Sequence, residues 1–178
     1  RRQAFILSKR PDLEIIPIRG NVPTRIQRMK DGYADAIILA YAGLTRLGLE
    51  SEASEVWGAE YILPAAGQGA VGVEIREGDD DTRHYFNAIH DRETGLCVAA
   101  ERAALQRLDG SCHTPIGAFA ILSGSKMHLD VIVASEDGQQ VFEDADESEI
   151  ESVSDATTLG DKVGNRLKAV VPEHILTT

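Results

Sequence analysis

The first fifty residues alternate between two patterns of apolar spacing, and this alternation restricts the fold more than any other feature of the chain. Residues 13–18 and 36–40 are short apolar runs rich in β-branched side chains, as is typical of strands buried on both faces. Residues 22–30 and 42–49 show helical spacing, and Asp31-Gly32 forms a helix stop. Strand, helix, strand, helix in this order predicts a parallel α/β unit, which binds ligands at the carboxyl ends of its strands.

The next part of the chain begins with a segment rich in small residues. Residues 63–70 contain too many Gly and Ala for a regular element, whereas residues 71–75 alternate like a strand. Two helices are predicted beyond them, from Asp79 to about His90 and from Asp91 to Leu108, each with an aspartate as its N-cap. A stripe of small apolar residues along the second helix predicts close packing against another element.

After Gly110 the pattern is typical of antiparallel β structure. Three strands are predicted at 116–122, 126–134 and 139–143, because Gly-containing turns separate them. A final amphipathic helix at about 155–170 is expected to cover one face of that sheet. The predicted fold class is therefore α/β plus α+β, a parallel α/β part followed by a small domain with a three-stranded antiparallel sheet and helices.

Composition favours a folded protein of one or two domains in a reducing compartment. Of 178 residues 43% are hydrophobic, and two cysteines cannot build a disulfide framework. The net charge of −11 is unevenly distributed: residues 136–161 carry ten acids and no Lys or Arg, while residues 1–46 carry nine basic and four acidic residues. The N-terminal part therefore suits an anionic ligand, and the acidic run is interpreted as a solvated strand edge and loop.

Several arginines and one loop are the candidate ligand-binding features. Guanidinium groups bind carboxylates through paired contacts, and Arg19 and Arg46 lie beside predicted carboxyl ends of strands. Residues 67–70 would let a ligand approach the backbone, but they match neither a Walker loop nor a dinucleotide fingerprint, so a hinge and a ligand loop stay equal alternatives. The arginine set is Arg1, Arg2, Arg19, Arg25 and Arg46.

Cys112 is the candidate reactive thiol, because it lies in a predicted loop flanked by Gly, Ser and Pro. Cys97 lies inside the alanine-rich helix and is interpreted as a small core residue. No metal site is expected, since no second ligand pair accompanies Cys112 and His113. Adjacent side chains tend to point apart, so His113 is a poor base for a Cys-dependent hydrolase.

A series of motifs in order along the whole chain resembles the porphobilinogen deaminase (hydroxymethylbilane synthase) family. They are Arg1-Arg2-Gln3, residues 19–22 with Thr24-Arg25, residues 35–40 with 42–44 and 46–49, Leu63-Pro64 with 67–70, residues 99–102, and Cys112 with 115–117. The resemblance implies a cytoplasmic transferase of tetrapyrrole (haem) biosynthesis. Such an enzyme adds four porphobilinogen units, each losing ammonia, to a covalently bound dipyrromethane cofactor and then releases hydroxymethylbilane.

The resemblance also implies roles for particular residues. Cys112 would hold the dipyrromethane through a thioether, the five arginines would bind pyrrole carboxylates, and Gln68 would lie near the ligand at the crossover between domains. The family's catalytic aspartate precedes Arg1, so no catalytic acid is assigned in this chain. Ser111 and His113 depart from the Gly and Gln of many members, which leaves the thioether unaffected. The expected partners are porphobilinogen and the N-terminal domain of the same protein, without nucleic acid or membrane, in a monomeric enzyme.

The family layout divides the chain into three parts. Residues 1–65 would belong to a second α/β domain like those of periplasmic binding proteins, residues 66–90 would cross back to the first domain, and residues 91–178 would form the C-terminal α+β domain. An opening at Arg1 without methionine predicts a fragment, which we expect to be inactive alone. The alternative is a non-catalytic α/β module that binds a small anion, which would need no reactive loop thiol.

Overall fold

The computed structural model describes residues 1–109 and 114–177. Its C-terminal part contains an antiparallel sheet in the order β1–β2–β3, formed by β1 (Ile116–Ser123), β2 (Lys126–Ala134) and β3 (Val141–Glu149). The predictions for the first two strands are confirmed. The third strand is longer than predicted, because its acidic residues alternate along an edge strand that pairs with β2 over its whole length.

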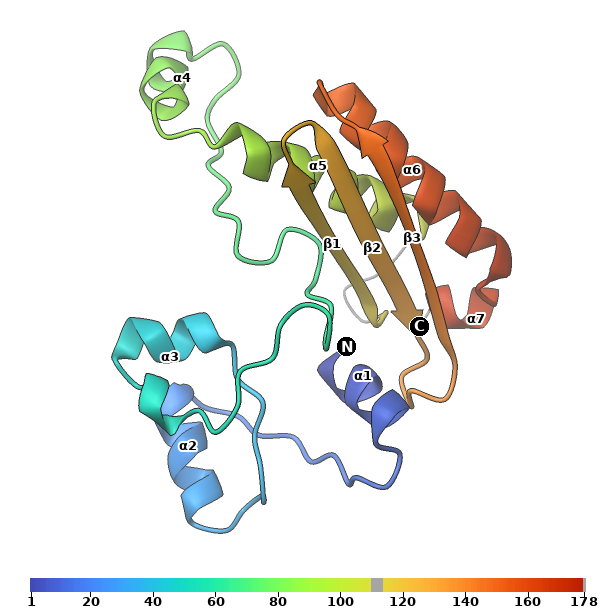
Figure 1. Ribbon diagram of the computed structural model, residues 1–178. Helices are drawn as coiled ribbons and strands as arrows, with labels where there is room; N and C mark the ends of the chain where they lie inside the picture. Colours follow the sequence, from blue (N-terminus) through green and yellow to red (C-terminus); the bar gives the residue numbers. More distant parts are fainter. Residues whose placement is uncertain (110–113, 178) are drawn as a thin grey trace.

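Helices α5 (Arg92–Arg107) and α6 (Val153–Val170) cover one face of this sheet, as Figure 1 shows. Each is capped as the sequence indicates: Asp91 accepts from the Thr94 amide at 2.7 Å, and Ser152 forms a capping box with Asp155. The inward-facing side chains of the strands and the two helices form the main core. Its members include Leu96, Ala100, Ala118, Met127, Leu129, Val131, Val133, Leu159, Val163 and Leu167.

Small residues bring α5 and α6 into close contact, as the stripe on α5 predicts. A Cβ at Gly160 of α6 would lie 2.1 Å from the carbonyl oxygen of Ala100, and one at Gly164 would lie 2.7 Å from that of Ala104. These distances are far below van der Waals contact, so the two helix backbones approach more closely than any larger side chain would allow.

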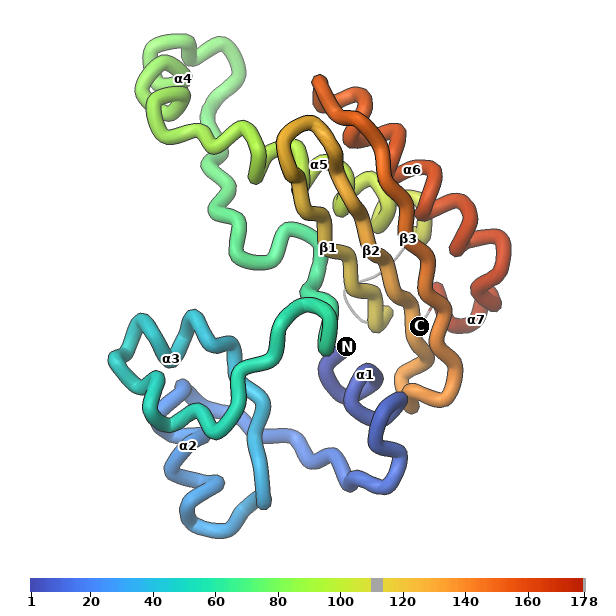
Figure 2. Tube along the Cα trace, in the orientation of Figure 1, coloured from blue at the N-terminus to red at the C-terminus, as the bar shows by residue number. Residues whose placement is uncertain are grey.

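The N-terminal part consists of short helices joined by extended chain. They are α1 (Arg2–Lys9), α2 (Val22–Lys30), α3 (Tyr41–Leu47), a 3₁₀ turn η1 (Glu50–Glu52) and α4 (Asp80–Asn87), while α7 (Glu173–Leu176) ends the described chain. Helix α2 begins and ends where predicted. Figure 2 shows α1 at the lower end of the sheet and the long connection from η1 to α4 running past the β1 side.

The strand predictions at 13–18, 36–40 and 71–75 are corrected by the described structure. None of these segments is a strand or a helix there, and no ladder pairs them with another strand among the described residues. A strand requires a partner for its backbone N–H and C=O groups, and periodicity alone cannot supply one. Val71 is accordingly 91% exposed.

Candidate functional site

Arg1 and Arg2 lie at the beginning of α1. A terminal nitrogen of Arg2, Nη1, donates to the carbonyl oxygen of Ile38 at 3.1 Å, which places this side chain beside the extended segment 36–40. Arg1 is half-buried, and its Nε is shielded from solvent without a hydrogen-bond partner among the described residues. Burial, reinforced by the charge of Arg2, lowers the pKa of the Arg1 guanidinium. Because a buried donor without an acceptor is costly, an anionic oxygen bound here would be stabilised.

Arg19 and Arg25 lie at the turn that begins α2. The Nε of Arg25 donates to the carbonyl oxygen of Gly20 at 2.7 Å, so the half-buried Arg25 side chain folds back toward Arg19. Asn21 caps the helix by accepting from the Thr24 amide at 2.9 Å. Gly20 has φ +122°, and a Cβ there would lie 3.0 Å from Thr24, so the turn favours glycine. The two arginines are thus held on one turn.

Arg46 is exposed in the last turn of α3. This helix lies beside α2, since a Cβ at Gly43 would be in ordinary contact with Val22 at 3.5 Å. Figure 1 shows the two helices together, away from the C-terminal sheet. Arg46 therefore belongs to the same part of the molecule as the turn that carries Arg19 and Arg25.

None of the five candidate arginines forms an ion pair with another described residue. By contrast Arg10, Arg107 and Arg166 pair with carboxylates at 2.6–2.7 Å. The five candidate arginines therefore belong to the cations whose charge no carboxylate of the described chain neutralises, a group that also includes Lys9, Arg28, Arg92 and Arg102. Uncompensated guanidinium groups attract anions, and paired contacts make them selective for carboxylates and phosphates.

The glycine-rich loop 67–70 is tied to the C-terminal domain by a buried carboxylate. Glu101 of α5 is only 6% exposed; its Oε2 accepts from the Gly67 amide at 2.7 Å and its Oε1 accepts from the Ala120 amide at 2.9 Å. The carbonyl oxygen of Pro64 also accepts from Ala118, at 3.0 Å. These bonds occupy backbone amides on the outer edge of β1 and fix the base of the loop, while Gln68 itself is exposed.

Sequence reasoning assigned no role to Glu101, although it lies in one of the family motifs. The available signal was a single acid within a helical stripe of small apolar residues. Such an acid must find donors when the stripe is buried, because an unpaired buried charge is very costly. This signal would have predicted a hydrogen-bonded structural role for Glu101.

The two cysteines differ in what the structure says of them. Cys112, the candidate attachment residue, lies outside the described residues. Cys97 is half-buried on α5 and packs against the main core, which confirms its interpretation as a small core residue. Burial raises the pKa of the Cys97 thiol, so this cysteine has less thiolate at neutral pH than an exposed one.

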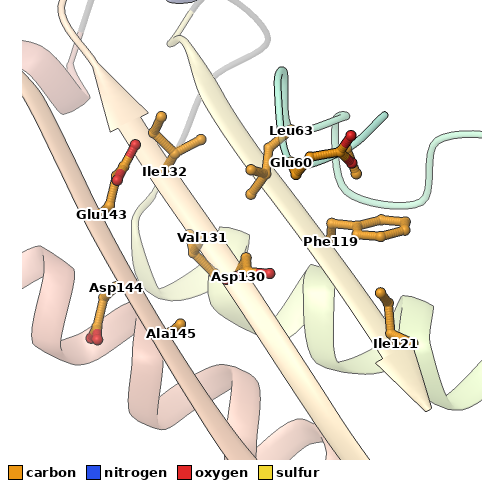
Figure 3. Close-up of a pocket in the computed structure, with 11 residues that line it drawn as sticks. Glu60, Leu63, Phe119, Ile121, Asp130, Val131, Ile132, Glu143, Asp144 and Ala145 are labelled. Atoms are coloured by element: carbon orange, nitrogen blue, oxygen red, sulfur yellow. The ribbon is translucent and has the colours of Figure 1, made fainter. Parts of the chain in front are cut away.

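A cavity of about 650 Å³ lies on the sheet face opposite α5 and α6, between the strands and residues 59–63 (Figure 3). Its lining includes Phe119 and the carboxylates of Glu60, Asp130 and Glu143, and it contains none of the candidate ligand residues. An acidic lining repels a polycarboxylate.

Within residues 1–109 and 114–177, no group of three or more His, Cys, Asp or Glu side chains is arranged to hold a metal ion. No helix in that same part is both long and apolar enough to cross a membrane.

The fold joins an N-terminal part, whose five candidate arginines have no ion-pair partner among the described residues, to a small α+β domain, and such a set of cations suits an anion with several carboxylates. Two family models match the chain: the porphobilinogen deaminase dipyromethane cofactor binding domain over residues 1–84, and the porphobilinogen deaminase C-terminal domain over residues 95–169. The chain therefore belongs to the porphobilinogen deaminase family, and the resemblance of its motifs is confirmed.

Curated relatives agree with this assignment. The chain is 47% identical over 141 residues to the porphobilinogen deaminase of Sorangium cellulosum, covering 79% of this chain and 47% of that protein. It is 42% identical over 177 residues to that of Nitrobacter hamburgensis, covering 99% of this chain and 55% of the relative. It is 41% identical over 178 residues to that of Alkaliphilus metalliredigens, covering 100% of this chain and 55% of that protein. The chain thus spans about half the length of these relatives.

The described residues fit the dipyrromethane that the family model names. The fit rests on the buried Nε of Arg1, which has no acceptor among the described residues, and on the other candidate arginines, which have no ion-pair partner in that same part of the chain. Acetate and propionate groups on a pyrrole would supply carboxylate oxygens to such donors.

Proposed function

We propose that this chain forms the cofactor-holding and carboxylate-binding part of a porphobilinogen deaminase. The enzyme adds four porphobilinogen units in turn to a dipyrromethane primer, with loss of ammonia at each addition, and hydrolysis then releases hydroxymethylbilane. The observation that carries the proposal is the set of five arginines without ion-pair partners among the described residues, in a chain that the family models match over most of its length. A growing chain of pyrroles is a polyanion, and these cations suit it.

Each candidate residue has a specific part in this proposal. Cys112 carries the dipyrromethane through a thioether. The bound cofactor would supply a fixed primer with a free end for chain growth. Gln68 contacts the ligand from the loop that Glu101 ties to the C-terminal domain. The carboxylates are bound by Arg1, Arg2, Arg19, Arg25 and Arg46.

The proposal extends to the organisation of the protein. Residues 1–65 form part of a binding-protein-like α/β domain, residues 66–90 cross to a preceding domain, and residues 91–178 form the cofactor-bearing domain. The enzyme works as a cytoplasmic monomer, with porphobilinogen as its substrate and no nucleic acid or membrane partner. The essential acid that handles the proton during ammonia loss comes from outside this chain.

Attachment at Cys112 is tested by intact-mass measurement of the purified holoprotein. We expect an added mass of two pyrrole units that is lost in Cys112→Ser and retained in Cys97→Ser. Cys97 is the matched control, because its thiol is half-buried and has a raised pKa. An adduct that persists in Cys112→Ser, or an active enzyme without any adduct, would contradict the proposal.

Replacing Arg19 with leucine is expected to lower kcat/KM for porphobilinogen at least about tenfold, because a charge-assisted hydrogen bond contributes about 1.5–3 kcal/mol. The side chain is exposed, so the unfolding midpoint should stay close to that of the wild type. Steady-state kinetics and thermal unfolding measure the two effects. Arg10→Leu is the control, since Arg10 already pairs with Asp12 at 2.6 Å. Wild-type kinetics from Arg19→Leu would remove this residue from the site.

A further inference from the structure

The turn between β2 and β3 touches the backbone of α1, although the two are far apart in the sequence. Gly138, in this turn, is buried and has φ +70°. A Cβ at this position would lie 2.4 Å from the carbonyl oxygen of Ala4 and 2.6 Å from the amide nitrogen of Ser8. Any side chain larger than hydrogen would therefore collide with main-chain atoms of α1, which cannot move without moving the helix.

An apolar contact beside the turn holds the same helix. Ala4 and Phe5 of α1 are 1% and 2% exposed, and they form a cluster with Ile132 and Ala134 at the end of β2. This cluster lies on the sheet face opposite α5 and α6. Helix α1 is thus seated on the C-terminal sheet, while its first turn carries the candidate ligand residues Arg1 and Arg2.

The turn itself is rigid, because its own hydrogen bonds close it. Ser135 exchanges main-chain and side-chain bonds with Gln140 at 2.9 and 3.0 Å, and Asp137 accepts from the Gln139 amide at 3.0 Å. The Gly138 amide donates to the carbonyl oxygen of Ser135 at 2.9 Å. A collision at Gly138 would consequently displace α1 rather than reshape the turn.

We infer that the end of the β2–β3 hairpin is a seat that positions Arg1 and Arg2 for the carboxylates of the ligand, with Gly138 as the positioning residue. The inference rests on the proposed function for its ligand. The contact itself, between α1 and the sheet, is independent of that function. The C-terminal domain would then both carry the cofactor and set the place of two arginines that bind it.

The fluorescence of Trp57 can report whether α1 stays in contact with the β2–β3 turn. Trp57 is the only tryptophan of the sequence, and its ring stacks on Tyr61 with the centroids 4.7 Å apart. The ammonium of Lys9, in the last turn of α1, lies 4.9 Å from the centre of the Tyr61 ring. Displacement of α1 would remove this cation and change the surroundings of the Tyr61–Trp57 pair, and hence the fluorescence of Trp57.

The two hairpin turns of the sheet supply a matched pair of variants. Gly124, in the β1–β2 turn, has φ +65°, but no atom of the described residues beyond its two chain neighbours lies within 4 Å of a Cβ built there. Gly138→Ala and Gly124→Ala therefore carry the same backbone strain, and only the first collides with α1. We would measure hydrogen exchange over residues 2–9 and Trp57 emission in the ligand-free chain. In the active enzyme we would measure the fraction carrying cofactor by intact mass and the KM for porphobilinogen.

We expect Gly138→Ala to speed exchange over residues 2–9, alter Trp57 emission, lower the loaded fraction and raise KM at least about tenfold, the effect of losing one charge-assisted bond. Gly124→Ala should leave the exchange rate, the Trp57 emission, the loaded fraction and the KM at wild-type values. Unchanged exchange in Gly138→Ala would overturn the seat, and faster exchange with unchanged KM and loading would overturn its positioning role. If Gly138→Ala does not fold, Phe5→Val loosens the same contact from the helix side. The same four measurements on Phe5→Val, with the same expected and contradicting results, then test the inference.

Arg1→Leu separates this inference from the proposed function. If Arg1→Leu weakens substrate binding and Gly138→Ala does not, the positioning role alone is wrong. If Arg1→Leu has wild-type KM and loading, the arginine assignment of the proposed function is wrong, and positioning of Arg1 for a carboxylate is overturned with it.

Discussion

Glu101→Ala is expected to lower the free energy of unfolding by about 2–6 kcal/mol, because it leaves two donors unpaired, and each buried unpaired donor costs about 1–3 kcal/mol. The amides of Gly67 and Ala120 both lose their acceptor, at the edge of β1 and at the base of the 67–70 loop. Urea unfolding followed by circular dichroism measures the change. Substrate binding should weaken as well, since the same bond fixes the loop that carries Gln68.

Two further variants show whether the carboxylate itself is responsible. Glu101→Gln keeps one acceptor oxygen with nearly the same shape, so we expect it to fall between the wild type and Glu101→Ala. Glu93→Ala removes an exposed carboxylate from the first turn of the same helix, which typically costs only about 0.3–1 kcal/mol. A Glu101→Ala variant no less stable than Glu93→Ala would contradict the role assigned to the buried carboxylate.

Gly160→Ala is expected to destabilise the C-terminal domain by about 1–3 kcal/mol or more, the usual range for overpacking. The added methyl group would lie 2.1 Å from the carbonyl oxygen of Ala100 and 2.7 Å from the Cβ of Ala103, so α5 and α6 must separate. This outcome opposes helix propensity, which favours alanine over glycine by about 1 kcal/mol. Thermal unfolding measures the net effect.

Gly43→Ala is the matched control for that substitution. Gly43 also lies inside a helix, α3, but a Cβ there would be in ordinary contact with Val22 at 3.5 Å. We expect Gly43→Ala to be neutral or stabilising. If Gly160→Ala were equally neutral, the close approach of α5 and α6 would not be a constraint on the fold.

The C-terminal domain was largely predictable because its determinants are local. Gly124 and Gly138 supply the positive φ of the two hairpin turns, and Asp91 caps the helix that follows it. The length of β3 was underestimated, since acids such as Asp144 and Asp146 resemble a loop in sequence. In the structure both pair with Arg166 of α6 at 2.6 Å. These tertiary contacts neutralise acidic side chains of β3 and so allow this segment to form a strand.

The candidate site divides in the same way. The types and spacing of the arginines, the Gly-rich loop and the family motifs were legible in the sequence, because side-chain chemistry and short-range geometry are encoded locally. The segments 13–18, 36–40 and 71–75 have the apolar pattern of strands, yet pairing depends on a partner that no local pattern specifies. The contacts of Glu101 with Gly67 and of Gly138 with α1 join residues distant in sequence, and only the tertiary structure decides which backbone groups meet there.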